Sequence, residues 1–311
     1  MAHKIKVLIT GASGLIGGRL VQYLKKKKIK ITATSRKKII QTRFKYSKIN
    51  WESSNSLEKL CKNKNIIINC AGYDLNKSKN KRKTFLVNSL KAQKLFKAAQ
   101  NSGVNYFIFL SSAHVYRNNL TGIINEKVRP NASGIYGLSK LDGEKKLKKI
   151  EKGTKLLILR PSNLFGHPSN KEVKCWHLLI NSVIKDLTLY KKSTILSKKN
   201  FYRNYSSIES FCDFIFFIIN KYIIKKKKLP KVINFCSENN ISLLNILSII
   251  KKRFQASRKN NKIKIKFKNS NLTKTNKLLY KSIYYKKFRF KKDKHFIKEL
   301  DSLISYCHSN F

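Results

Sequence analysis

Acidic residues are scarce in this chain. Its 311 residues include 15 Asp and Glu against 69 Lys and Arg, so the formal charge is +54. One interpretation is a polyanionic partner, either nucleic acid or an acidic membrane surface. The other is a compositional bias toward Lys, Asn and Ile that fills solvated surfaces with lysine. The abundance of Asn and Ile favours this second interpretation.

Proline, glycine and paired cysteines are also scarce. With 4 Pro and 12 Gly, the chain does not have the composition of a long disordered linker. Its 6 Cys are scattered without a CxxC pair, which predicts neither a zinc site nor a disulfide framework and fits a reducing cytoplasm. We therefore expect no metal site. The length allows one large domain or two smaller ones.

Long apolar runs are absent. Residues 1–10 are basic and then apolar, but the apolar part is too short for a signal peptide. The most apolar stretch, FCDFIFFIINKYII at 211–224, is interrupted by Asp213 and Lys221. It also falls short of the roughly 20 residues that a membrane span needs. We expect a buried helix there, no membrane span and a cytoplasmic protein.

The first half of the chain alternates continuous apolar runs with helix-like segments. We expect strands at 4–10, 29–34, 65–70, 105–110 and 155–160, and helices at 14–27, 55–62, 83–102 and 135–151, the third of them ending at Gly103. Such alternation indicates a parallel sheet covered on both faces, so we predict a Rossmann-type doubly wound α/β fold.

The pattern changes after Pro161. Helices are expected near 172–186, 207–224 and 241–254, with short strands near 231–235 and 262–267. We therefore predict a Rossmann domain at 1–165 and a smaller C-terminal substrate-binding cap at 166–311. Some late segments of the cap are expected to return to the sheet.

A glycine-rich loop, TGASGLIGGRL, joins the first strand to the first helix. Gly11, Gly14 and Gly17 permit a tight turn, close approach of the backbone to a pyrophosphate and close packing of helix on strand. The helix N-terminus then offers free N–H groups to phosphate oxygens. The position between a strand and a helix predicts dinucleotide binding. We expect the intervening residues to contact the cofactor as well: Ser13, Leu15 and Ile16.

The second predicted strand ends in TATSRKK and carries no acid there. An acid at this point would bind the ribose 2′-hydroxyl of NAD. Arg36 could instead pair with a 2′-phosphate. The sequence therefore favours NADP over NAD.

IYGLSK at 135–140 places Tyr136 and Lys140 four residues apart, on one face of the expected helix. A nearby ammonium favours phenolate, so we expect Lys140 to lower the pKa of Tyr136. A tyrosine tuned in this way can exchange a proton near neutral pH.

Six segments, in order along nearly the whole chain, carry a family resemblance: TGASGLIG at 10–17, NCAG at 69–72, FIFLSSAHVY at 107–116, IYGLSK at 135–140, LRPSNLFG at 159–166 and VINFCSENNISLLNIL at 232–247. Together they resemble the extended short-chain dehydrogenase/reductase family. That family comprises the NAD(P)-dependent nucleotide-sugar epimerases, dehydratases and reductases.

The resemblance implies that Ser112, Tyr136 and Lys140 are catalytic. Tyr136 would be the general acid/base on a sugar oxygen, Lys140 would also hold the nicotinamide ribose, and Ser112 would hydrogen-bond the same oxygen. Further cofactor contacts are implied for Asn50, Ala71, Gly72, Asn88 and Pro161. Substrate contacts are implied for Ser112, Asn163 and Arg203.

Two departures from the family pattern concern the substrate. Family dehydratases usually have an acidic pair after the catalytic serine or threonine, where this chain has Ala113 and His114, so a 4,6-dehydratase is disfavoured. His114 is either an extra acid/base or a structural residue. RNYSSIES at 203–210 keeps Arg203 for a substrate pyrophosphate but replaces other polar positions of the family. The resemblance therefore does not fix the substrate.

The sequence leads to a nucleotide-sugar epimerase or 4-keto reductase of surface-polysaccharide synthesis. An inactive relative that binds RNA or another polyanion, or serves in assembly, is one alternative, and a reductase of a non-sugar carbonyl is another. Helices such as 83–102 and 135–151 commonly pair in family dimers, so we also expect a homodimer.

Overall fold

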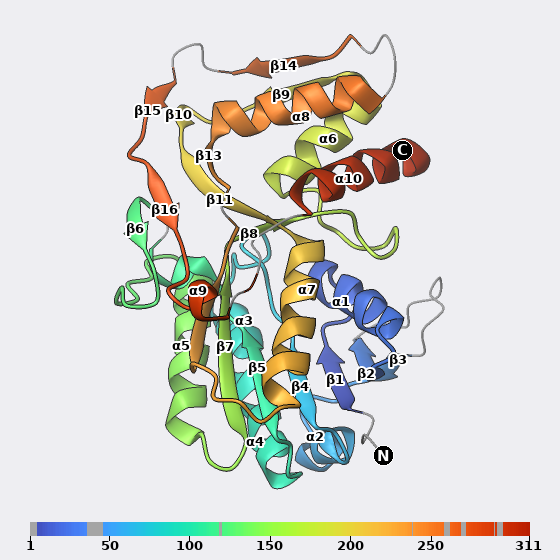
Figure 1. Ribbon diagram of the computed structural model, residues 1–311, viewed down its shortest axis with the longest axis vertical. Helices are drawn as coiled ribbons and strands as arrows, with labels where there is room; N and C mark the ends of the chain where they lie inside the picture. Colours follow the sequence, from blue (N-terminus) through green and yellow to red (C-terminus); the bar gives the residue numbers. More distant parts are fainter. Residues whose placement is uncertain are drawn as a thin grey trace.

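A seven-stranded parallel sheet forms the centre of the molecule (Figure 1). The structure is a computed structural model that describes residues 5–35, 46–117, 120–237, 239–257, 262–268, 272–288, 290 and 295–311. The strand order is β12-β7-β5-β4-β1-β2-β3, and each neighbouring pair is parallel. The strands are β1 (Lys6–Thr10), β2 (Lys30–Ser35), β3 (Tyr46–Lys48), β4 (Ile66–Asn69), β5 (Tyr106–Leu110), β7 (Lys155–Pro161) and β12 (Val232–Phe235).

The strands are apolar on both faces because helices cover both sides of the sheet. In β4, Ile66 and Ile68 belong to the core beneath α1 and α7, whereas Ile67 belongs to the core beneath α2, α4 and α5. This confirms the predicted doubly wound α/β fold. The covering helices are α1 (Leu15–Lys26) and α7 (Ile208–Ile218) on one face, and α2 (Ser54–Cys61), α4 (Lys91–Asn101) and α5 (Ile135–Ile150) on the other.

The helix expected at 83–102 is present, but a π-helical turn divides it. α3 (Lys81–Phe85), η1 (Leu86–Leu90) and α4 follow one another without a break, and the π turn contains the buried side chains of Asn88 and Ser89. Gly103 follows the helix with a left-handed φ of +69°, as expected for the glycine that ends a helix.

The C-terminal half builds a cap beyond one end of the sheet (Figure 1). Ile184, Leu243 and Leu300 belong to the apolar core that its three main helices share. These helices are α6 (Leu179–Tyr190), α8 (Leu243–Ser257) and α10 (Phe296–Asn310). The shorter elements are η2 (Ala113–Val115), β6 (Gly122–Ile124), β8 (Asn163–Phe165), β9 (Lys192–Ile195), β10 (Lys199–Asn200), β11 (Tyr202–Ser207), η3 (Ile219–Ile223), β13 (Asn240–Ser242), β14 (Lys264–Phe267), β15 (Thr273–Lys274), β16 (Leu278–Tyr280) and α9 (Tyr285–Phe288).

Late segments of the chain return to the sheet. β12 pairs with β7 at the edge of the sheet, and α7 packs beside α1 on one face. The apolar stretch at 211–224 lies almost entirely in α7 and η3, and half of its side chains are buried in the sheet core. Across the described ranges, no helix is both long and apolar enough to cross a membrane.

One predicted helix begins later than expected. Residues 172–178 form turns, and α6 starts only at Leu179. The Asn181 side chain donates to the Gly166 carbonyl at 2.9 Å and contacts Cys175 Sγ at 3.4 Å. These contacts hold the preceding segment against the start of α6, so its apolar residues are buried without forming a helical face.

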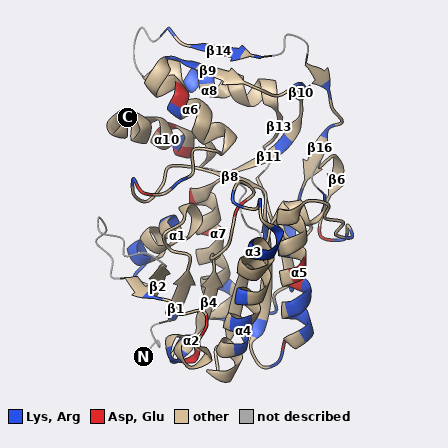
Figure 2. Ribbon diagram, turned by 180° about the vertical axis from the view of Figure 1, so that it is seen from behind, with Lys and Arg blue, Asp and Glu red and all other residues tan. Residues whose placement is uncertain are grey.

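Basic residues occur on both parts of the molecule (Figure 2). They lie on α4 and α5 beside the sheet and on β14 in the cap. This spread over many elements favours a compositional bias as the source of the charge.

A buried carboxylate joins the cap to the sheet layer. Glu299 of α10 accepts two hydrogen bonds from the Arg19 guanidinium of α1, at 2.6 Å and 2.9 Å. It also accepts the backbone N–H groups of His167 at 3.3 Å and Glu209 at 3.1 Å. Arg19 in turn donates to the His167 carbonyl and to the Glu209 carboxylate. With exposures of 6% and 2%, Arg19 and Glu299 are each buried and paired.

We expect Glu299→Ala to lower the free energy of unfolding by about 3–5 kcal/mol, because it leaves the Arg19 guanidinium buried opposite an empty space. Asp301→Ala is the matched control, since Asp301 lies on the same helix and binds Arg253 through both carboxylate oxygens, but is 40% exposed. Its loss is expected to stay below about 1 kcal/mol. Urea unfolding of both variants checks this, and equal losses would contradict it.

Candidate active site

A cavity of about 640 Å³ opens at the carboxyl ends of the parallel strands. The segments that follow β1, β4, β5 and β7 build its walls, together with the start of α5 and cap residues 173–180. The chain turns outward from β1 to β2 and returns to β4 on the other side of β1. Ligands of open α/β sheets bind at this kind of reversal of strand order.

The loop after β1 is a cradle that excludes side chains. Gly11 has a φ of +68°, and a Cβ there would lie 2.6 Å from the Ala71 nitrogen. A Cβ on Gly17 would lie 2.4 Å from the Gly11 carbonyl oxygen, whereas one on Gly14 would come no closer than 3.3 Å to it. The loop therefore leaves the N-terminus of α1 open to the cavity, as a dinucleotide phosphate requires. The expected neighbours also line the cavity: Ser13, Leu15 and Ile16.

Asn88 and Gly72 shape the loop after β4. Asn88 accepts from the Tyr73 N–H at 2.7 Å, and its amide donates to the Tyr73 carbonyl at 3.2 Å and to Ser139 Oγ at 3.0 Å. Gly72 lines the cavity, and a Cβ there would meet Asn88 Oδ1 and Lys140 Nζ at 3.0 Å. The Asn88 side chain therefore holds the loop after β4 in place, although Asn88 is not one of the residues that line the cavity.

The other expected cofactor residues have different placements. Pro161 lines the cavity, and Ala71 lies directly beneath Gly11. Asn50 is exposed after β3, accepts from the Glu52 N–H at 3.0 Å and is not one of the residues that line the cavity. Arg36 lies outside the described residues.

Ser112, Tyr136 and Lys140 meet at one wall of the cavity. Ser112 follows β5 and caps η2 by accepting the His114 N–H at 3.2 Å. Tyr136 and Lys140 lie in the first two turns of α5, and both line the cavity beside Ser112. Lys140 Nζ donates to the Leu110 carbonyl at 2.9 Å. The fold thus brings the three predicted catalytic residues together.

Burial raises the pKa of Tyr136, the hydrogen bond from Ser112 opposes this rise, and the Asp74 carboxylate adds to it. Lys140 is not one of the groups that shift this pKa. The expectation that Lys140 lowers the pKa of Tyr136 is therefore wrong for the protein chain alone. The Lys140 ammonium is directed at the Leu110 carbonyl, and burial lowers its own pKa to about 8.

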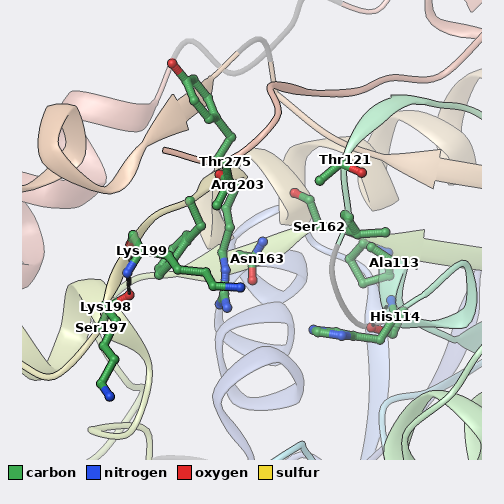
Figure 3. A pocket seen from close by; sticks show the side chains of 15 residues that line it. Ala113, His114, Thr121, Ser162, Asn163, Ser197, Lys198, Lys199, Arg203 and Thr275 are labelled. Carbon is green, nitrogen blue, oxygen red and sulfur yellow. Dashed lines mark hydrogen bonds between the residues drawn. The ribbon is translucent and has the colours of Figure 1, made fainter. Parts of the chain in front are cut away.

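A second cavity, of about 470 Å³, adjoins the first and shares Ser112, Asn163 and Arg203 with it. Lys198, Lys199 and Arg203 come from the wall opposite Ala113 and His114 (Figure 3). Among the described residues that line this cavity, none is an Asp or Glu. Several cations without a neighbouring acid suit an anionic group such as a phosphate.

The site also contains residues that sequence reasoning missed. Asp74, after β4, and His177, before α6, lie 3.5 Å apart and close the first cavity from the cap side. His177 fell inside the helix expected at 172–186, so no signal pointed to it. The lysines of SKKN at 197–200, shortly before Arg203, were a readable signal for the second cavity.

The model of the NAD dependent epimerase/dehydratase family matches residues 7–235. The chain belongs to this family. The extended short-chain dehydrogenase/reductase resemblance predicted from the motifs is thereby confirmed. Membership does not by itself distinguish epimerases from reductases or dehydratases.

Individual relatives in this epimerase/dehydratase family differ in activity. The chain is 27% identical over 276 residues to a dTDP-D-glucose 4,6-dehydratase of Dictyostelium discoideum, an alignment that spans 78% of this chain but 60% of that protein. It is 22% identical over 256 residues to a GDP-6-deoxy-D-talose 4-dehydrogenase of Aggregatibacter actinomycetemcomitans, with 79% of each chain covered.

Solved structures of similar fold include a UDP-glucuronic acid 4-epimerase of Bacillus cereus in complex with UDP-glucuronic acid and NAD. It has a TM-score of 0.79 and 19% identity, with 99% of this chain and 100% of that chain covered. MoeE5 in complex with UDP-glucose and NAD has a TM-score of 0.78 and 18% identity, with 98% and 99% covered. At these identities, the likeness shows the shared fold.

Two substitutions in the glycine loop separate its role in packing from its role in cofactor binding. We expect Gly17→Ala to lower the free energy of unfolding by about 1–3 kcal/mol, because its Cβ would overlap the Gly11 carbonyl. Gly14→Ala is expected to keep the melting temperature within a few degrees but to weaken NAD binding at least about tenfold, since its methyl group stands at the expected phosphate position. Thermal melting without cofactor and a fluorescence titration with NAD test the pair. A Gly14→Ala protein that binds NAD like the wild type would contradict this assignment.

Burial and the neighbouring Arg203 lower the pKa of His114 to about 4. Between this value and its unfolded value of about 6.5, the unfolded chain binds more protons, so acidification destabilises the fold. We expect His114 to contribute a loss of about 2 kcal/mol between about pH 7 and pH 5. Urea midpoints of wild type and His114→Gln at both pH values isolate this term, because all other titrating groups are shared. Equal slopes in the two proteins would contradict it.

Proposed function

We propose that the protein is a nucleotide-sugar epimerase or 4-keto reductase that transfers hydride with NAD or NADP. One observation carries the proposal: Ser112, which lines the glycine-loop cavity together with Tyr136, also lines the cation-lined cavity. The first suits a dinucleotide, and the second suits a sugar diphosphate. The reacting sugar carbon would therefore lie where the two cavities join.

The protein's own residues supply proton transfer and positioning. When bound, the nicotinamide cofactor would supply or accept the hydride, and the glycine loop, where a Cβ on Gly11 or Gly17 would overlap the backbone, would hold its phosphates. The raised pKa of Tyr136 keeps its phenol protonated, so Tyr136 is poised to donate a proton to a sugar keto oxygen. The Ser112 hydroxyl stabilises the negative charge that develops on that oxygen.

The second cavity binds the substrate in this proposal. We assign the substrate diphosphate to Arg203, with Lys198 and Lys199 nearby. Asn163 lines both cavities. Its amide nitrogen donates to the Asn204 carbonyl at 3.0 Å, and this contact fixes the orientation of the Asn163 side chain. Ala113 and His114 replace the acids that a 4,6-dehydratase would use, so we do not extend the activity of the Dictyostelium relative to this chain.

We propose NADP as the preferred cofactor. The support is the sequence SRKK at 35–38, which has no acid to bind a ribose 2′-hydroxyl. A role in surface-polysaccharide synthesis in the cytoplasm and a homodimer built on α4 and α5 complete the proposal. The dimer has support in Leu86, Leu90 and Leu138, which are more than a third exposed on η1 and α5.

The proposal is tested by incubating the purified protein with UDP-glucose, UDP-glucuronic acid, and dTDP- and GDP-hexoses, each with NAD, NADH or NADPH. Products are identified by mass spectrometry and proton NMR. An epimer formed without net cofactor use identifies an epimerase, and consumption of reduced cofactor with a keto sugar identifies a reductase.

Tyr136→Phe is expected to lower turnover by about 10²–10⁴-fold, because it removes the proton donor. It is expected to keep the melting shift that the cofactor induces in the wild type. Undiminished turnover in this variant would overturn the role of Tyr136. A wild type that binds no nicotinamide cofactor, but binds RNA in a salt-sensitive way, would overturn the enzyme proposal.

A further inference from the structure

His114 is held rigidly beside the catalytic residues. Its N–H donates to Ser112 Oγ at 3.2 Å. Its carbonyl oxygen lies so close to α5 that a Cβ on Gly137 would come within 2.4 Å of it. The backbone of His114 is thus fixed between Ser112 and the helix that carries Tyr136, and its side chain has little freedom to leave the site.

The imidazole ring lies between the catalytic tyrosine and the substrate cations. Its centroid is 5.7 Å from that of the Tyr136 ring, in an edge-to-face arrangement with an interplanar angle of 69°. Figure 3 shows the ring pointing into the cavity, toward the side from which Arg203 enters. His114 lines both cavities, so a sugar that reaches Tyr136 passes against this ring.

The surroundings select one form of the ring. Nδ1 is buried and has no hydrogen-bond partner within the described part of the chain. A proton on Nδ1 would be an unpaired buried donor, which is costly, so the neutral ring carries its proton on Nε2. The same cost, added to the charge of Arg203, opposes the imidazolium form. Nε2–H is the donor that remains available to a ligand.

We infer that His114 is a substrate-binding specificity residue, whose neutral Nε2–H donates a hydrogen bond to a hydroxyl or keto oxygen on the sugar carbon next to the one that Tyr136 serves. The inference rests on the proposed function and names the part of the substrate that this chain recognises. Hexopyranoses carry oxygens on neighbouring carbons, and a ring in edge contact with Tyr136 faces the neighbouring one. The site selects sugars with an oxygen at that position over deoxy sugars.

This role differs from that of a general acid or base. A proton shuttle must gain a proton as well as lose one, and gaining one would place an N–H at the enclosed Nδ1. His114 therefore keeps its proton and contributes a fixed dipole. Once a substrate covers it, a donor of this kind penalises a substrate that lacks the matching acceptor, because the donor is then left buried and unpaired.

Three substitutions test the inference: His114→Gln, His114→Asn and His114→Phe. The amide nitrogen of Gln reaches the position of Nε2, whereas that of Asn reaches only the position of Nδ1. With whichever of the nucleotide sugars named under the proposed function the wild type converts best, we expect Phe and Asn to lower kcat/KM by about 10- to 100-fold. Gln is expected to stay within about fivefold of the wild type. A purely structural role would instead follow side-chain size and would not separate Gln from Asn in this way.

Substrate analogues give a second readout. We expect the wild type to bind the 3-deoxy or 3-fluoro analogue of the same nucleotide sugar at least about tenfold more weakly than the parent, and His114→Phe to bind both equally. Calorimetric titration in the presence of NAD measures each affinity. If Phe fails to fold, the comparison of Gln with Asn decides alone.

The outcomes separate the two proposals. Equal kcat/KM for Gln and Asn, or discrimination that persists in His114→Phe, overturns the inference while the wild-type turnover upholds the proposed function. A wild type that neither converts nor binds any of the nucleotide sugars named under the proposed function overturns both. A bell-shaped pH profile that loses one limb in His114→Gln overturns the neutral-donor role in favour of acid/base chemistry.

Discussion

The position of the cap depends on the carboxylate of Glu299. This group accepts hydrogen bonds from Arg19 on α1, from the backbone after β8 and from the N-terminus of α7. α1 begins directly at the glycine loop, and Arg19 lies one turn into it. The same contact therefore fixes the glycine-loop end of the first cavity and the cap residues that line the second. The Glu299 carboxylate can remain charged and buried because both of its oxygens accept hydrogen bonds.

A second buried carboxylate organises the cavity wall that contains Ser112, Tyr136 and Lys140. Glu144 of α5 accepts two hydrogen bonds from Arg160 of β7, at 2.9 Å and 2.6 Å, and one from Ser111 at 2.5 Å. Ser111 precedes Ser112, and Glu144 lies one helical turn beyond Lys140. One ion pair therefore sets Ser112 and α5 relative to each other. The relative placement of Ser112 and Tyr136 is a property of the core rather than of a loop.

The sequence predicted the sheet and the glycine loop well because both have local signatures. Continuous apolar runs mark strands covered on both faces, and glycine spacing reports a turn that no side chain fits. The cap was predicted less well, since its contacts join distant segments: Arg19 and Glu299 are 280 residues apart. The start of α6 depends on Asn181, and the pKa of Tyr136 depends on its burial and on Ser112 and Asp74. Spacing along a helix contains neither kind of information.

The π turn at Leu86–Leu90 changes the direction in which side chains point before and after it within one continuous helix. A π turn holds one residue more than an α turn, and each residue of an α-helix advances it by about 100°. The extra residue lets α4 keep its apolar stripe on the sheet while Asn88 faces the loop at Tyr73. The face that α4 packs on the sheet and the direction of the Asn88 side chain are thus set independently within one helix. A regular α-helix of the same sequence would satisfy only one of the two.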